Sequence, residues 1–107
     1  MADKPRLRVP TDAKKGDVIT IKTLMSHPME NGFRKDETGK PIPRKIINSF
    51  VCSFGGHEVF RADLEPAIAA NPYFEFTVRV EESGTFTFAW IDDDGTVTTA
   101  EQGITVT

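Results

Sequence analysis

The sequence has no pair of cysteines, no long apolar segment and no excess of basic residues. Cys52 is the single cysteine among 107 residues, so an internal disulfide is excluded. No run of eighteen apolar residues occurs, which excludes a membrane-spanning helix. The net charge is −3, which argues against a nucleic-acid-binding protein, because such proteins typically carry a stripe of basic residues. We therefore expect one domain, residues 1–107, whose partners are neither nucleic acid nor membrane.

Tryptophan and tyrosine are also scarce, with one residue of each against eight phenylalanines. A core built from this chain is therefore expected to be rich in phenylalanine. A chain of this length buries roughly 65% of its extended surface on folding, which suffices for a core without metals or disulfides.

Apolar residues alternate with polar ones along most of the chain, which is typical of strands with one buried face. Gly55-Gly56 and Asp92–Gly95 separate alternating segments, and such residues favour tight hairpin turns. The expected strands cover residues 7–9, 18–25, 46–54, 57–62, 73–80, 85–91 and 96–106, the last broken near Gly103. Residues 65–70 are expected to hold one helical turn. The pattern predicts an all-β, immunoglobulin-like β-sandwich of about seven strands, with a small open barrel as the alternative.

The hairpin of residues 46–62 is predicted to have two dissimilar faces. One face carries three residues that suit a core: Phe50, Cys52 and Phe54. The other face carries three β-branched apolar residues: Ile47, Val51 and Val59. A soluble protein seldom leaves such a patch bare, so we expect a partner to cover this second face. Packing under the loop of residues 26–45 is the alternative.

The connection of residues 26–45 is long for a compact domain, and loops of this length are often functional. Prolines keep its second half extended. Four of its side chains are candidate docking contacts: His27, Met29, Arg34 and Arg44. The two arginines offer forked donors to carboxylates or to anionic sulfur groups. For each residue taken singly, a solvated charged loop is an equally good interpretation.

Cys52 is predicted to be buried and inert, because it lies in phase with two phenylalanines. A blue-copper site usually needs a methionine after the cysteine, and no methionine follows Cys52. The alternative function is a small metal-binding or redox β-sandwich in which Cys52 acts with His27 or His57.

The acidic run Asp92–Asp94 ends in glycine and fits a turn better than a calcium loop, in which acids occupy alternate positions. No Ser-His-Asp arrangement and no phosphate-binding glycine loop is evident. The sequence therefore predicts a binding module without catalytic residues, cofactor or metal site.

Several strings resemble those of one family, the SoxZ proteins, which are the Z subunits of the SoxYZ sulfur carrier of bacterial thiosulfate oxidation. The strings are Ser-His-Pro-Met-Glu-Asn-Gly at 26–32, Gly-Lys-Pro-Ile-Pro at 39–43, Ile-Ile-Asn-Ser-Phe at 46–50, Asn-Pro-Tyr-Phe-Glu-Phe at 71–76 and Trp-Ile-Asp-Asp-Asp-Gly at 90–95. The likeness extends over nearly the whole chain.

The resemblance implies an immunoglobulin-like sandwich that forms a heterodimer with a SoxY subunit. SoxY holds the sulfur intermediates on a cysteine in a C-terminal Gly-Gly-Cys-Gly-Gly arm. The resemblance also implies transient contacts with the c-type cytochrome pair, the hydrolase and the sulfane dehydrogenase of the cycle. The Z subunit is expected to lack a signal peptide of its own and to reach the periplasm with its partner.

Residues 102–107 contain neither a cysteine nor a glycine arm, so a non-catalytic, non-carrier role is expected for this chain. No family catalytic residue has a counterpart to assign. In the absence of its partner, the chain is expected to form a homodimer through the patch described above.

Overall fold

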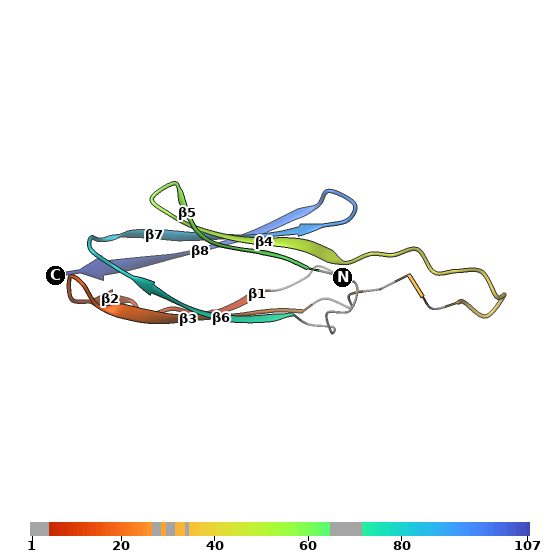
Figure 1. Ribbon diagram of the computed structural model, residues 1–107, viewed down its shortest axis with the longest axis horizontal. Helices are drawn as coiled ribbons and strands as arrows, with labels where there is room; N and C mark the ends of the chain where they lie inside the picture. The colour runs from red at the N-terminus through yellow and green to blue at the C-terminus, as the bar shows by residue number, and fades with distance from the viewer. Residues whose placement is uncertain (1–4, 27–28, 30–31, 34, 65–71) are drawn as a thin grey trace.

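Alternation between buried and exposed side chains generates eight strands in two facing sheets within the described residues of the computed structural model (Figure 1). The structure describes residues 5–26, 29, 32–33, 35–64 and 72–107. The strands are β1 (Pro5–Arg8), β2 (Asp12–Ala13), β3 (Val18–Met25), β4 (Ile47–Phe54), β5 (His57–Asp63), β6 (Tyr73–Arg79), β7 (Gly84–Asp92) and β8 (Val97–Val106). One sheet has three strands in the order β1-β3-β6, and the other has five in the order β2-β8-β7-β4-β5.

The five-stranded sheet is built from two hairpins that lie side by side. β4 and β5 are joined by Gly55 and Gly56, both with positive φ, which a tight turn of this kind requires. β7 and β8 are joined by the turn of residues 93–96, where Gly95 also has positive φ. β4 pairs with β7 in the antiparallel sense and so links the two hairpins.

The core between the sheets is made mainly of aromatic rings. Phe50 on β4 stacks on Phe74 of the opposite sheet, with ring centroids 4.6 Å apart, and lies 5.1 Å from the ring of Trp90. Phe60 on β5 stacks on Phe76 of β6 at 4.2 Å. Ring pairs of this kind add to the area they bury and hold the two layers in one register. The expectation of a phenylalanine-rich core is confirmed.

The predicted β-sandwich is confirmed, and most strands fall where alternation placed them. The prediction that the final strand is broken near Gly103 is wrong, because Gly103 pairs regularly with Thr85 within β8. β2 was not predicted; it is a two-residue strand that pairs in parallel with the end of β8. The expected helical turn of residues 65–70 lies outside the described residues. The described part of the chain contains no helix of the length and apolarity needed to cross a membrane.

Candidate partner-binding surface

The outer face of the five-stranded sheet carries side chains in rows that cross four strands. The first row is Asp63, Ser49, Ile91 and Val97; the second is Arg61, Val51, Ala89 and Thr99; the third is Glu58, Ser53, Thr87 and Glu101. The two central strands, β4 and β7, contribute only uncharged residues to these rows. We call them the neutral strip, which consists of Ser49, Val51, Ser53, Thr87, Ala89 and Ile91.

Three charged side chains border the neutral strip on the β5 side, and one borders it on the β8 side. On β5, Arg61 Nε donates to Glu58 Oε1 at 3.0 Å, and Asp63 is exposed beside them. On β8, Val97 is 52% exposed and Glu101 closes the third row. A neutral centre within a polar rim is the usual anatomy of a protein–protein interface.

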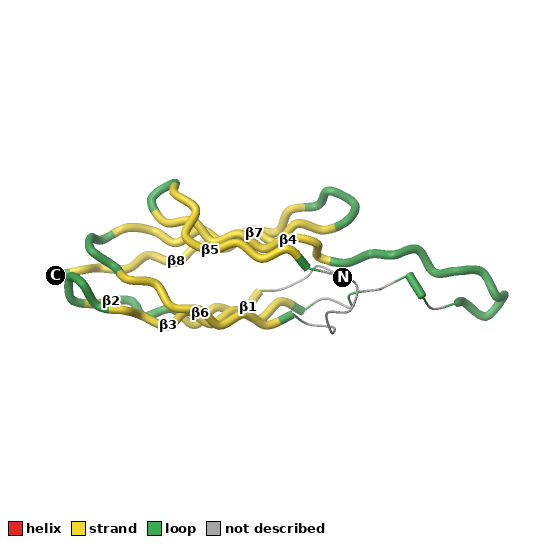
Figure 2. Tube along the Cα trace, in the orientation of Figure 1, coloured by secondary structure: helices red, strands yellow, loops and turns green. Residues whose placement is uncertain are grey.

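Residues 35–45 form an arm that extends beyond the end of the sandwich at which β4 begins (Figure 2). Asp36 organises the turn at its tip, because its Oδ1 accepts from the Thr38 amide at 2.9 Å and the Lys40 amide at 3.0 Å. A bridge between Lys35 and Pro41 joins the two limbs of the arm. The arm is therefore a folded hairpin-like extension.

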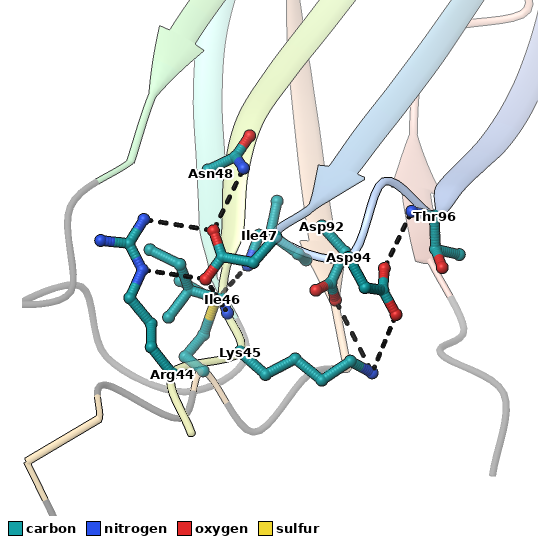
Figure 3. A network of polar contacts seen from close by, with 10 residues as sticks. Arg44, Lys45, Ile46, Ile47, Asn48, Asp92, Asp94 and Thr96 are labelled. Carbon is teal, nitrogen blue, oxygen red and sulfur yellow. Dashed lines mark hydrogen bonds and ion pairs between the residues drawn. The ribbon is translucent and has the colours of Figure 1, made fainter. Parts of the chain in front are cut away.

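The base of the arm is held to the β7–β8 turn by a network around the Asp93 carboxylate. The Arg44 guanidinium binds this carboxylate through two hydrogen bonds. Nε donates to Oδ2 at 2.9 Å, and Nη2 donates to Oδ1 at 3.1 Å. The Ile46 amide and the Asn48 side chain donate to the same carboxylate at 3.1 and 3.2 Å. Figure 3 shows Arg44 and Asn48 converging on one side of the turn, while Lys45 reaches the other. The network fixes the direction in which the arm leaves the sandwich.

These donors change the acidity of the carboxylate that they surround. The hydrogen bonds from Arg44 lower the pKa of Asp93 from 3.8 to about 2, with smaller contributions from the Ile46 amide and Asn48. Lys45 lies 4.0 Å from Asp92 and 3.9 Å from Asp94, so each acid of the turn has a cation nearby. The expected turn at residues 92–95 is thus a docking point for the arm.

Comparison with known proteins gives one sequence family. Residues 7–103 match the model of the family described as "Sulphur oxidation protein SoxZ". The chain belongs to the SoxZ family. This membership confirms the resemblance seen in the sequence and assigns the chain a role in sulfur oxidation. Among curated proteins, no sequence matches significantly.

Solved structures share the fold of this SoxZ-family chain at low identity. The superoxide reductase (neelaredoxin) of Ignicoccus hospitalis has a TM-score of 0.75 at 19% identity, over 96% of this chain and 80% of that one. A putative superoxide reductase from Thermotoga maritima has a TM-score of 0.75 at 18% identity, over 96% and 85%. The sulfur carrier protein SoxY from Chlorobium limicola f thiosulfatophilum has a TM-score of 0.68 at 13% identity, over 96% and 78%. These matches show a common β-sandwich fold.

Of the residues singled out for the second face of the β4–β5 hairpin, two lie where they were expected. Val51 occupies the centre of the neutral strip, and Val59 is 40% exposed at the bulge where the pairing of β4 with β5 shifts. The expectation that Ile47 shares this face is wrong, because Ile47 is only 2% exposed. The register with β7 shifts between Ile47 and Ser49, so a bulge interrupts the alternation and turns Ile47 into the core.

The loop candidates have more varied positions. Met29 is 5% exposed, and its sulfur accepts a hydrogen bond from the Ile47 amide at 3.3 Å. The expectation that Met29 is an accessible docking contact is therefore wrong, since its side chain closes the end of the core. Arg44 is exposed, but its guanidinium is used in the Asp93 network. His27 and Arg34 lie outside the described residues.

Cys52 is fully buried, between Phe60 and Phe88 on the neighbouring strands. Burial raises the pKa of its thiol from 9.0 to about 12, so the thiolate needed for metal binding or nucleophilic attack is disfavoured. His57 is exposed at the other end of the hairpin. The described residues contain no cluster of three or more His, Cys, Asp or Glu side chains that would hold a metal ion.

Sequence reasoning missed two features of this surface. Ala89 and Ile91 complete the neutral strip, but only the pairing of β4 with β7 shows that they lie beside Val51. Phe33 is 81% exposed next to the arm, at an unusual position for a phenylalanine. Its place between a glycine and an arginine in a polar loop was the available signal in the sequence.

Proposed function

We propose that this SoxZ-family chain is the non-catalytic subunit of a heterodimeric sulfur carrier, in which a SoxY-like partner holds sulfur intermediates on a cysteine during thiosulfate oxidation. The neutral strip is the observation that carries the proposal. It is a broad uncharged area on a chain in which about a quarter of the residues are charged. A permanent partner accounts for such an area, because obligate interfaces are depleted of charge at their centre.

The state of Cys52 supports the assignment of the sulfur-bearing cysteine to the partner. A carrier cysteine must reach the active sites of several enzymes and react as a thiolate. The only thiol of this chain is buried on the inner face of β4, in the core between the two sheets, and its pKa is raised. The chain therefore needs a second subunit to hold the substrate.

The partner is expected to pack a sheet face against the neutral strip. SoxY of Chlorobium limicola has the same sandwich fold, and two sheets stack well at a spacing of about 10 Å. Burial of Val51, Ile91 and Val97 would contribute less than the roughly 1.5–3 kcal/mol of a fully exposed side chain, because each is already partly buried in the single chain. We expect Phe33 and the arm to add contacts beyond the end of the sandwich.

Co-expression with a SoxY-like subunit tests the proposal. Val51→Asp places a charge at the centre of the neutral strip, and Val97→Asp places one at its more exposed margin. Both changes are expected to abolish co-purification of the two subunits while the chain keeps its circular dichroism spectrum. Val18→Asp is the matched control, since Val18 is 57% exposed in a strand of the other sheet.

Normal pairing of the Val97→Asp variant would contradict the assignment of this face, even if Val51→Asp disrupted folding. Loss of pairing in the Val18→Asp control alone would move the interface to the opposite sheet.

The same proposal includes a periplasmic location, reached by export together with the partner. The expected result is that the chain appears in the periplasmic fraction only when the partner carries its signal peptide. Accumulation in that fraction without the partner would contradict co-export.

A further inference from the structure

The outer face of the three-stranded sheet has a chemistry opposite to that of the neutral strip. The pairing of β1, β3 and β6 places four cationic side chains on this face: Arg6, Arg8, Lys22 and Arg79. All four residues are exposed, and among the described residues of these three strands Glu75 supplies the one carboxylate of the face. A positive face is notable on a chain whose net charge is −3. We call this surface the basic face, which consists of Arg6, Arg8, Lys22, Leu24, Tyr73, Glu75 and Arg79.

The one carboxylate of the basic face neutralises only part of its charge. Glu75 Oε1 lies 3.8 Å from Lys22 Nζ and accepts a hydrogen bond from the Tyr73 hydroxyl at 3.0 Å. Within the described residues, Arg6 and Arg8 have no carboxylate within ion-pair distance. Two guanidinium groups on one short strand therefore direct uncompensated charge outward.

Arg6, Leu24 and Tyr73 form one row across the three strands, and Arg8, Lys22 and Glu75 form the next. A shallow groove of about 390 Å³ runs along these rows and is lined by Arg6, Arg8, Lys22, Leu24 and Tyr73. Tyr73 is 53% exposed. Arginine and tyrosine are the residue types enriched where binding energy concentrates at protein interfaces, and the face extends about 20 Å along β3.

We infer that the basic face is a docking surface for an acidic patch on another protein, separate from the neutral strip that pairs with the permanent partner. Uncompensated cations steer an acidic partner and give fast, salt-sensitive, transient contacts. A net acidic chain disfavours nucleic acid, and the mixture of guanidinium, phenol and aliphatic groups suits a protein surface better than a lone anion. The acidic partners are expected to be enzymes of the sulfur-oxidation cycle, and this part of the inference rests on the proposed function.

The test uses the cytochrome pair, the hydrolase and the sulfane dehydrogenase of the cycle as probes, each passed over the immobilised chain, alone and paired with its SoxY-like subunit. At about 20 mM NaCl we expect at least one probe to bind, and we expect binding to weaken steeply by about 150 mM. The double variant Arg6→Glu/Arg8→Glu should weaken that binding about ten-fold or more and remove most of its salt dependence.

The control variant Lys14→Glu/Lys15→Glu makes the same change in net charge at two exposed lysines of the β2–β3 turn. It should change affinity by less than about two-fold. Equal losses in both variants would show an effect of net charge alone and overturn the inference. Absence of binding by every probe would also overturn it.

Two further outcomes assign the face differently. Competition by sulfate or thiosulfate at millimolar concentration, with no effect of the arginine variant on protein binding, would make it a small-anion site. Binding of the wild type to phosphatidylglycerol vesicles, with no protein bound, would make it a lipid-binding site. Either result overturns the inference. Pairing with the SoxY-like subunit is read in the same experiment, so failure of the proposed function is seen separately.

Discussion

Cys52 owes its chemistry to its surroundings. Its neighbours across β4 are Phe60 and Phe88, and the opposite sheet closes over them. A thiol in such surroundings loses the solvation that stabilises the thiolate, and its pKa rises to about 12. The residue acts as a small apolar side chain.

We therefore predict that iodoacetamide modifies Cys52 only after the protein is unfolded. The measurement is the mass of the native and the urea-denatured protein after treatment at pH 8. Rapid modification of the native protein would contradict the burial of the thiol. Cys52→Ala should leave pairing with a SoxY-like subunit intact.

Gly84 shows a second constraint at a single residue, because a ring occupies the place of its missing side chain. A Cβ atom at this position would lie 2.7 Å from Cζ of Phe54, whose ring packs 4.5 Å from that of Phe86. We predict that Gly84→Ala lowers the free energy of unfolding by about 1–3 kcal/mol, because the rings must move.

Urea unfolding followed by tryptophan fluorescence measures this change. Gly103→Ala is the control, since its nearest atom, the Gly84 carbonyl oxygen, is 3.9 Å from the added Cβ. A smaller loss for Gly84→Ala than for Gly103→Ala would mean that the Phe54 ring gives way without cost.

At the scale of structural elements, the attachment of the arm to the sandwich depends on the ionisation of one carboxylate, that of Asp93. Asp93 holds its base, and its pKa in the folded protein is about 2 against an ordinary value of 3.8. Because its pKa is lower in the folded state, the ionised Asp93 carboxylate stabilises the folded protein, and this stabilisation is fully present above about pH 4. It is lost as the pH falls from about 4 to about 2, when the carboxylate takes up a proton.

We predict that Asp93→Asn lowers the free energy of unfolding by about 1–2 kcal/mol at pH 7, a value that allows for partial solvent screening. The difference between variant and wild type should shrink as the pH falls through that window. Urea unfolding at a series of pH values gives the measurement. Asp12→Asn, an exposed carboxylate on β2, is the control, and an equal loss there would exclude a specific role for Asp93.

The strands were predictable because each carries its own alternation. β3 illustrates this, since Ile19, Ile21 and Thr23 are buried while Val18 and Lys22 are exposed. The bulge that turns Ile47 inward has no comparable signal, because it arises from the fit of β4 against β7. Likewise, Gly103 reads as a break in isolation, but pairing with Thr85 keeps it in the strand.

The candidate surface was less predictable than the fold, because it depends on contacts between distant segments. Val51 could be placed on an outer face from its own hairpin. Its neighbour Ala89 belongs to a strand 38 residues away in the sequence, and only pairing joins the two. Met29 read as a loop residue, but it is drawn into the core by the closure of the sandwich end.

At the scale of the whole molecule, the two outer faces are chemically distinct. The neutral strip on one side should adhere to apolar surfaces, whereas the basic face on the other should repel its own copy. Of the two outer faces, the neutral strip is therefore the one that suits a symmetric contact between two copies of the chain.

We predict that the isolated chain forms a dimer as its concentration rises, and that Val97→Asp shifts this equilibrium toward the monomer. Sedimentation equilibrium over a range of concentrations measures the effect. The control is Val18→Asp, which should leave self-association unchanged. A wild-type chain that stays monomeric throughout the range would contradict the prediction.

The arm and the lengthwise run of the strands make the molecule a rod, 59 Å long and 20 by 19 Å across (Figure 1). Its radius of gyration is 16.2 Å, whereas a compact chain of this length would have about 13 Å. A rod has a higher frictional coefficient than a sphere of equal mass and tumbles faster about its long axis than end over end. A single chain will consequently leave a sizing column early, with the apparent mass of a larger protein. Nuclear spin relaxation should report two rotational correlation times, according to the orientation of each amide bond to the rod axis.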